Sequence, residues 1–532
     1  MPSTYKVIYN SDVTNVVYCV SPYNSQRGAT LTAAKLDASV KEAADAGADA
    51  FSFTPGLCWV PGWPSNEFPA KEYTNWFLNI FKGKITSDPH YNYAFNHPTQ
   101  GWGAVYHDIV QEQIDSCRKY GMDAIFSYRM NDSHFSQKTS TSTAKIGYTP
   151  QIQIDHPEWL QSEGSAFEQT LFDYRFEGYR EFRLKMIKEA IRNYELDGFE
   201  MDFMRWHKIF TVSKTTSAQR LQIMTGFIRE IRKELDAATA KDGRYRHLIA
   251  KIPAWTDSYD AMGIDLKEWE KAGVTIFNLS SSYYTVQNPE IETVKKQVSN
   301  AQVFYELHPV ASLAPPDASP SYINCGIATM RRTTVEQLYT TAYLAYQKGA
   351  DGISLFNFQY YRGIPESPND DRENKNFVNE PPFQAVKNLG DRNFLAKQAQ
   401  HYFFGRTDLR TFRTSWEMPT SFGAGVSETY TMYMVAPKGG WTKDGTLRIQ
   451  SELALGNAVF EVKLNGIALT LMDKDPGEPY ESAYTTLLGN AKKRRCYVVP
   501  KGILKNGQDN VIEVTQVSGA FSFLSYIDLS IV

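Results

Sequence analysis

Two acidic residues stand two positions apart in an apolar run, a pattern that can place two carboxylates on one face of a strand. The run reads Asp197-Gly198-Phe199-Glu200-Met201-Asp202-Phe203-Met204-Arg205-Trp206. Because side chains alternate along a strand, Glu200 and Asp202 are predicted to share one face, and the phenylalanine and methionine side chains the other. Two buried charges need partners, so the alternative to a chemical role is a structural ion-pair network.

A further acidic residue, Glu306, lies in a second apolar run, Val303 to Leu307. If the two runs face each other, a substrate bond can lie between Asp202 and Glu306. Such a pair suits hydrolysis of a glycosidic bond, because one carboxylic acid protonates the leaving oxygen while one carboxylate attacks the anomeric carbon or activates water. Which residue takes which role, and whether the configuration is retained or inverted, stays open at this point. A supporting hydrogen bond to a neighbour is the alternative for Glu306.

Other polar and aromatic side chains at the predicted strand ends and in one loop are expected to bind the substrate. They are Glu200, Arg205, Arg129, Asn131, Asp132, His134, Lys251, Trp255, Asn278, Asn357, Trp59 and Trp63. The basic members, Arg129, Arg205 and Lys251, suit an acidic or sulfated sugar, since guanidinium groups match carboxylate and sulfate oxygens.

Aromatic residues are abundant, with 32 Tyr, 30 Phe and 10 Trp in 532 residues. Large aromatic faces stack on flat apolar ligand surfaces such as sugar rings. The stretch from Pro55 to Gly101 is especially aromatic and is predicted to be a long loop that forms a substrate platform or lid. Its tryptophans Trp59 and Trp63 follow a predicted strand directly, and packing within the loop's own core is the alternative for each of them.

Several classes of protein lack support in the sequence. The formal charge is −3, from 56 basic and 59 acidic residues, and no basic stripe favours nucleic acid as a partner. The histidines and the five cysteines show no metal-ligand spacing, and no phosphate-binding or dinucleotide motif occurs, so no metal or cofactor is expected. No apolar run is long enough to span a membrane, and no signal peptide is evident. We expect a mature periplasmic or extracellular domain whose signal has been removed, and its oligomeric state stays open.

The elements that must position these side chains follow a regular series. Eight short apolar runs alternate with helical periodicity. The predicted strands are Asn15 to Val20, Ala48 to Thr54, Asp123 to Arg129, Leu196 to Phe203, Leu248 to Trp255, Val274 to Ser280, Val303 to Leu307 and Gly352 to Phe358. Among the helices, those from Glu181 to Tyr194 and from Ala218 to Leu235 are clearest. Gly47, Gly121 and Gly349 are expected to end helices in the left-handed conformation.

These repeats predict a (β/α)8 TIM barrel over residues 1–400, in the α/β class, with its active site at the carboxyl ends of the strands. After Gln400 the pattern changes to period-two strands and hairpin turns, as at Asn465-Gly466. We therefore predict a C-terminal antiparallel β-sandwich over residues 405–532. It offers no cluster of acidic, histidine or basic residues in register, so it is expected to hold no catalytic residue.

Several longer sequence segments of the predicted barrel are similar to those of a known family. His156-Pro157-Glu158-Trp159, Phe172-Asp173-Tyr174, the segment Tyr179 to Leu184, Tyr128 to Asp132 and the strand with Glu200 and Asp202 resemble the family-10-like glycoside hydrolase barrels of bacterial polysaccharide-degradation systems. The resemblance spans about residues 14–360 and implies a carbohydrate-active barrel, commonly with a C-terminal sandwich. Chitinase-like barrels carry their acid at the position of Met204, so the sequence disfavours chitinase chemistry. Several α-glycosidase barrels place a nucleophilic Asp where Asp202 stands.

The leading hypothesis is therefore a glycosidase that cleaves a poly- or oligosaccharide, acidic or sulfated sugars included, with Asp202 and Glu306 as its catalytic carboxylates. Two alternatives stay open. One is a carbohydrate-binding barrel without catalysis, and the other is a polysaccharide lyase that uses Tyr, His or Lys as its base.

Overall fold

The computed structural model describes most of the chain in two compact units. The described residues are 4–19, 21–25, 31–55, 61, 63–68, 108–132, 151–166, 168–282, 284–312, 330–359, 380–405, 418, 420–451, 453–477 and 491–532. The first unit comprises Met1–Ser280, Thr293–Phe304 and Ser354–Tyr360, and the second comprises Ser281–Glu292, Tyr305–Ile353 and Tyr361–Val532. No helix among the described residues is long and apolar enough to cross a membrane.

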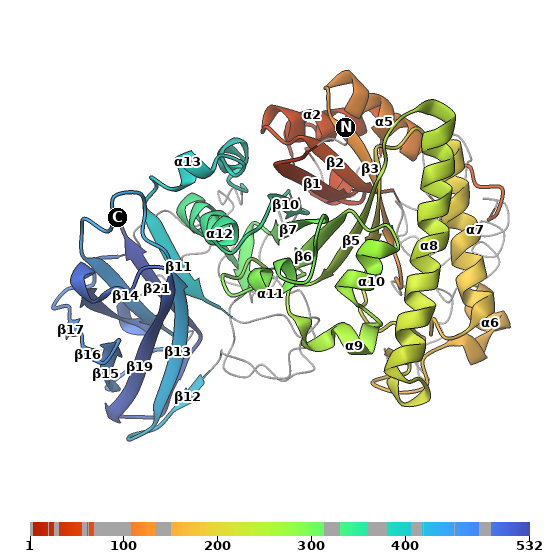
Figure 1. The fold of residues 1–532 in the computed structure, drawn as a ribbon. Coiled ribbons are helices and arrows are strands. Elements are labelled where there is room, and N and C mark those ends of the chain that lie inside the picture. Colours follow the sequence, from red (N-terminus) through yellow and green to blue (C-terminus); the bar gives the residue numbers. More distant parts are fainter. Residues whose placement is uncertain are drawn as a thin grey trace. The chain divides into compact units, whose positions relative to one another are not determined.

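Eight strands form a closed barrel in the order β1-β10-β7-β6-β5-β4-β3-β2, which confirms the predicted (β/α)8 fold (Figure 1). Neighbouring strands from β1 to β6 pair in parallel. The strands are β1 (Val7–Asp12), β2 (Ala50–Thr54), β3 (Asp123–Arg129), β4 (Gly198–Asp202), β5 (His247–Pro253), β6 (Ile276–Ser280), β7 (Gln302–Leu307) and β10 (Gly352–Phe356). Seven of the eight predicted strands therefore coincide with barrel strands.

The first predicted strand is wrong. The run from Asn15 to Val20 was expected to be β1, but Asn15–Tyr18 is a short helix, α1, and β1 is the preceding segment Val7–Asp12. The reason is physical: β1 ends in Asn10, Ser11 and Asp12, which look like a turn in sequence. In the barrel these polar residues are buried, and Asn10 and Asp12 find partners across the interior on β4 and directly after β10.

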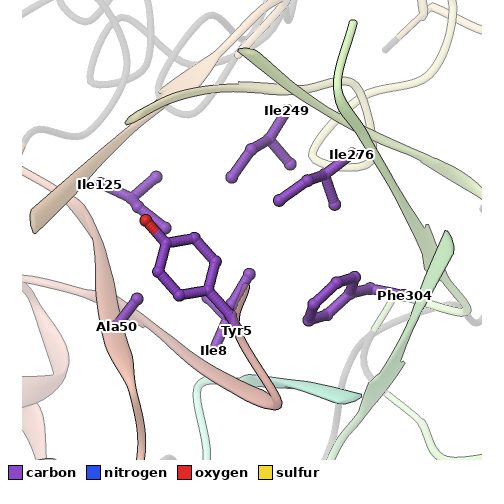
Figure 2. Packing of buried hydrophobic residues seen from close by; sticks show 7 residues of the cluster. All are labelled: Tyr5, Ile8, Ala50, Ile125, Ile249, Ile276 and Phe304. Atoms are coloured by element: carbon purple, nitrogen blue, oxygen red, sulfur yellow. The ribbon is translucent and has the colours of Figure 1, made fainter. Parts of the chain in front are cut away.

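The barrel interior has an apolar layer towards the amino ends of the strands. Figure 2 shows Ile8, Ala50, Ile125, Ile249, Ile276 and Phe304 converging around Tyr5. One step further along the strands the inward-facing residues are polar and fully or almost fully buried: Asn10, Ser52, Ser127, Glu200, Lys251, Asn278 and Ser354. The barrel is thus closed by hydrocarbon at one end and filled with polar groups nearer the carboxyl ends.

Helices cover the barrel strands as predicted. The helices expected from Glu181 and from Ala218 are α7 (Glu177–Asn193) and α8 (Ser217–Asp242), which run side by side outside the barrel (Figure 1). Gly47, Gly121 and Gly349 have φ values of 93°, 71° and 98°, which confirms the left-handed helix ends. The other helices are α2 (Ala33–Asp45), α5 (Ile109–Lys119), α6 (Gln151–Asp155), α9 (Tyr259–Met262), α10 (Leu266–Lys271), α11 (Ile291–Lys295), α12 (Val335–Gln347) and α13 (Arg392–Leu395).

The C-terminal strands form two antiparallel sheets, in the orders β11-β21-β14-β18-β17 and β13-β19-β15-β16, and a pair β12-β20. They are β11 (Gln400–Phe404), β12 (Thr420–Phe422), β13 (Ser427–Met434), β14 (Gly445–Gln450), β15 (Val459–Leu464), β16 (Ile467–Ala468), β17 (Thr470–Leu471), β18 (Arg494–Val499), β19 (Gln508–Ser518), β20 (Ser522–Leu524) and β21 (Tyr526–Ile531). Strands β8 (Val310–Ser312) and β9 (Met330–Arg332) form a separate hairpin. The sandwich is confirmed. Its first strand, β11, starts at Gln400 rather than after residue 405. The division of the chain into domains of residues 1–400 and 405–532 stays a prediction.

One expectation about the sandwich is wrong, because it does contain a charged cluster in register. Asp528 on β21 lies beside Arg448 on β14, and its Oδ2 is 2.9 Å from His401 Nε2 and 3.0 Å from Arg448 Nη1. Gln450 donates to its other oxygen. These residues lie on three separate strands, so only the strand register brings them together.

Candidate active site

Three neighbouring strands place charged side chains next to one another at their carboxyl ends. Asp202 on β4 pairs in register with Arg129 on β3 and with Lys251 on β5. The alternation predicted for β4 is confirmed by two aromatic contacts. The ring centres of Phe199 and Phe126 are 5.7 Å apart, and those of Phe203 and Trp269 of α10 are 5.4 Å apart. These aromatic side chains face the helices, so Glu200 and Asp202 face the barrel interior.

Asp202 is a buried carboxylate with one oxygen that makes no hydrogen bond within the described part of the chain. It is 1% exposed, and its Oδ1 accepts a hydrogen bond of 2.8 Å from the backbone N–H of Met204. Its Oδ2 is buried and has no hydrogen-bond partner among the residues that the structure describes. Buried carboxylate oxygens without a donor cost free energy, so this atom is suited to accept a hydrogen bond from, or react with, a bound molecule.

Glu200, by contrast, has both oxygens occupied. Asn10 and Ser127 donate to its Oε1 at 2.6 and 2.7 Å, and Asn278 donates to its Oε2 at 3.3 Å. Burial raises the pKa of the Glu200 carboxyl, an effect that Lys251 opposes and Asp202 reinforces. In this structure Glu200 therefore organises the polar interior of the barrel, and its predicted role in substrate binding stays a prediction.

An ion-pair cluster, the alternative that the sequence left open, lies beside Asp202, and its central acid, Asp12, was not predicted. Arg129 Nη2 is 2.7 Å from Asp12 Oδ1, and Arg129 Nη1 is 2.7 Å from Asp132 Oδ2. Arg205 Nη2 lies 3.8 Å from Asp12 Oδ2. Burial alone would raise the pKa of Asp12, but Arg129, Arg205 and a hydrogen bond from Asn357 outweigh it and hold this pKa well below its usual range.

Asn357, which directly follows β10, completes this cluster. Its Nδ2 donates to Asp12 Oδ2 at 2.8 Å, and its Oδ1 accepts from the backbone N–H of Asp12 at 2.9 Å. Asn357 has a φ of 46°, a left-handed conformation that residues with a β-carbon rarely adopt, so its contacts must stabilise it. Asp12 was missed because β1 was predicted too late in the chain. The sequence feature that could have identified Asp12 is the period-two spacing of Ile8, Asn10 and Asp12, which places all three on the inward face of β1.

The phrases that carry the family resemblance have a definite structural role. Arg183 of α7 donates to the backbone oxygen of Arg129 and lies with its Cζ 4.3 Å from the centre of the Tyr128 ring. Tyr174 and Tyr179 donate to the backbone oxygen of Met130 at 2.5 and 3.4 Å. These side chains hold the carboxyl end of β3, and with it Arg129, in place. The first aspartate of the β4 phrase, Asp197, instead pairs with Arg118 and Arg244 at the opposite end of the strand.

Other predicted substrate-binding residues lie in varied surroundings. The amide of Asn131 bonds the backbone oxygens of Phe172 and Lys208 and the backbone N–H of Phe172, so it anchors a loop. Trp255 is fully buried after β5, and Asn278 lies deep beside Glu200. Lys251 Nζ lies 3.5 Å from the centre of the Phe356 ring.

The aromatic loop is described only in part. Trp63 is 5% exposed, meets Phe126 edge-on at 5.5 Å and donates to Glu189 Oε2 at 3.0 Å. Phe126 faces away from the barrel interior, so Trp63 packs on the outer wall, and these contacts give no support to a substrate platform. Trp59 and His134 lie outside the described residues.

Glu306 lies on β7, in the second unit, and is 2% exposed. Phe304, two residues earlier on the strand, points into the barrel interior (Figure 2), and alternation turns Glu306 the same way. Within the described ranges no three or more His, Cys, Asp or Glu side chains gather as a metal site.

No family model and no curated protein matches the sequence. Among solved structures, a chitinase from Bacillus thuringiensis is similar, with 11% identity and a TM-score of 0.41 over 98% of this chain and 100% of that chain. An alpha-amylase from Lactobacillus plantarum has 13% identity and a TM-score of 0.38, covering 96% and 98%. An alpha-L-fucosidase from Bacteroides thetaiotaomicron has 10% identity and a TM-score of 0.34, covering 97% and 94%. Likenesses this distant carry no inference about activity, and the barrel and sandwich rest on the strand order itself.

Proposed function

We propose that the chain is a glycoside hydrolase that cleaves a poly- or oligosaccharide at the carboxyl end of the barrel, with Asp202 and Glu306 as its two carboxylates. The observation that carries the proposal is Oδ2 of Asp202, a buried carboxylate oxygen without a hydrogen-bond partner among the described residues. The end of β4 lies where (β/α)8 enzymes place their active sites.

The surroundings of Asp202 suit this chemistry. The N–H of Met204 fixes one oxygen and leaves Oδ2 to the substrate, so the reacting atom has a defined direction. Glu306 supplies the second carboxylate that glycoside hydrolysis needs: one of the two protonates the leaving oxygen, and the other attacks the anomeric carbon or takes a proton from the attacking water. The family-10-like membership and the assignment of the two roles remain part of this proposal.

The ion pairs bear on the charge of the substrate. Arg129 was expected to bind an acidic or sulfated sugar, but its side chain is 2% exposed and bonded to Asp12 and Asp132. A guanidinium group already matched by two carboxylates gains little from a third anion. We therefore propose a neutral sugar at the reaction centre, in preference to an acidic or sulfated one.

We also propose that the protein is located in the periplasm or outside the cell.

The test is a panel of neutral and sulfated or uronic-acid polysaccharides, assayed for reducing ends with a parallel absorbance scan for unsaturated products. New reducing ends without unsaturated products support the hydrolase. Unsaturated products would identify a lyase, and binding without either product would identify a carbohydrate-binding barrel. Faster hydrolysis of neutral than of charged glycans with the same backbone supports a neutral sugar at the centre.

A further inference from the structure

Asp12 links β1 to two other barrel strands, through Arg129 on β3 and through Asn357 directly after β10. It lies at the end of β1, forms an ion pair of 2.7 Å with Arg129 from β3, and exchanges two hydrogen bonds with Asn357 after β10. The Asp12 side chain is 5% exposed and that of Arg129 is 2% exposed, so water screens this pair little. Such a buried cation cannot change partner without a large change in local electrostatics.

The cation held by Asp12 is a neighbour of the proposed reacting carboxylate. Arg129 and Asp202 are paired in register on adjacent strands, and both side chains point inward. Nevertheless, Asp202 makes no ion pair with any residue in the described part of the chain, whereas Arg129 is matched by Asp12 and Asp132. Asp12 and Asp132 thus compete with Asp202 for the positive charge of Arg129.

We propose that Asp12 is a positioning residue of the reaction centre, which holds Arg129 away from Asp202 and so keeps Asp202 Oδ2 available for the substrate. This inference rests on the proposed function for its consequence in turnover. Its structural part, the competition between Asp12 and Asp202 for Arg129, can be measured without any substrate.

The sign of the effect on Asp202 follows from the charges around it. The groups that face the centre from the first unit are Asp12 on β1, Arg129 on β3, Glu200 on β4, Lys251 on β5, and Asp132 and Arg205 after β3 and β4. Glu306 and His308 are buried titratable groups at the end of β7 in the second unit. Replacing Asp12 by Asn removes one negative charge and leaves Arg129 and Arg205 less compensated, which favours the ionised form of Asp202.

The first measurement is the pH profile of kcat/KM for Asp12→Asn. The limb that reports Asp202 should move to lower pH than in the wild type, because a less compensated cation nearby favours the ionised carboxylate. The direction is the same whether Asp202 acts as acid, base or nucleophile, because its ionised form is favoured in each case. Asp132→Asn, which removes the other partner of Arg129, should shift the limb in the same direction, and Asp12→Glu should restore the wild-type profile in part.

A matched control is Asp197→Asn at the other end of β4. Asp197 also pairs with two arginines, Arg118 and Arg244, and accepts a hydrogen bond from the backbone N–H of Ala124 at 2.8 Å. It should lower the melting temperature and leave the pH profile of the folded enzyme unchanged. Equal pH profiles for wild type, Asp12→Asn and Asp197→Asn would overturn the positioning role.

The second measurement needs no activity and uses melting temperatures of the wild type, Asp12→Asn, Asp202→Asn and the double variant. In the wild type, Asp202→Asn removes a buried charge without an ion partner and should leave the melting temperature equal or higher. In the Asp12→Asn background, Asp202 becomes a partner of Arg129, so the same change should lower it. If the two changes are additive, the inference fails, whatever the activity. If no glycan is hydrolysed but the sign reverses, the proposed function fails and the coupling of Asp12 to Asp202 stands.

Discussion

The barrel and the sandwich each bury an aspartate among cationic and polar side chains, Asp202 in the first and Asp528 in the second. Both are at most 1% exposed. Asp528 has a donor on each oxygen: Gln450 on Oδ1, and His401 and Arg448 on Oδ2. Asp202 has the Met204 N–H on Oδ1 and no described partner on Oδ2. Burial of a carboxylate therefore does not by itself mark a reactive site, whereas a carboxylate oxygen left without a donor does point to a ligand.

Glu189 of α7 extends the comparison to a third buried carboxylate. Its Oε1 accepts from the N–H groups of Asn66 and Glu67 at 2.6 and 3.2 Å. Its Oε2 accepts from Trp63 and Ser65 at 3.0 and 2.5 Å. Like Asp528, this carboxylate is fully occupied by the protein, so we assign it to holding the segment around Trp63 on the barrel wall.

The largest effect is expected at Asp202. Asp202→Asn keeps the size and removes the charge, and it should lower kcat by at least about 10²-fold, since a general acid–base or nucleophilic group contributes that much or more. Steady-state kinetics on the glycan that the wild type hydrolyses, with a melting curve to show folding, measure it. Turnover near the wild-type rate would remove Asp202 from the mechanism.

Asp528→Asn makes the same chemical change in the sandwich and should act on stability instead. It weakens a buried ion pair and leaves Arg448 poorly matched, which typically costs about 3 to 5 kcal/mol. Urea unfolding should show this loss, while kcat and KM of the folded enzyme stay at their wild-type values. A 10²-fold loss of kcat without a change in the unfolding midpoint would show that the sandwich carries a catalytic residue after all.

Trp63→Phe tests whether Trp63 packs on the outside of the barrel or binds the substrate. The phenyl ring keeps the contact with Phe126 and loses the N–H bond to Glu189, a hydrogen bond to a charged group worth about 1 to 3 kcal/mol. We expect a lower free energy of unfolding with KM unchanged. A several-fold rise in KM with unchanged stability would instead restore the substrate platform expected from the sequence.

The smallest effect, and one that depends on pH, is expected at Glu200. Burial raises the pKa of this carboxyl above its unfolded value, so the folded state holds a proton that the unfolded state releases. The contribution to stability is therefore present below the unfolded pKa and is lost as the pH rises through the folded pKa. Glu200→Gln cannot titrate, so its unfolding free energy relative to wild type should rise with pH across that window. A constant difference across the window would contradict the raised pKa.

Much of this protein followed from the sequence by local rules. The alternation in the run around Glu200 and Asp202 predicted which side chains face inward, because a strand has a period of two wherever it lies. Left-handed glycines such as Gly121 marked the helix ends, and the Asn465-Gly466 turn marked a hairpin, with φ values of 53° and 81°. These features depend on residues close together in the chain, so the barrel and the sandwich could both be predicted.

The tertiary structure decided which of the buried acids has an oxygen to spare. Asp12, Arg129 and Asn357 are far apart in the chain, and barrel closure and register bring them together. The same is true of His401, Arg448 and Asp528 in the sandwich. A hydrogen bond or an ion pair depends on distances between atoms on different strands, and the residue types alone do not contain those distances. The sequence could therefore nominate Asp202, but only the folded chain shows that its neighbour Arg129 is already paired with Asp12 and Asp132.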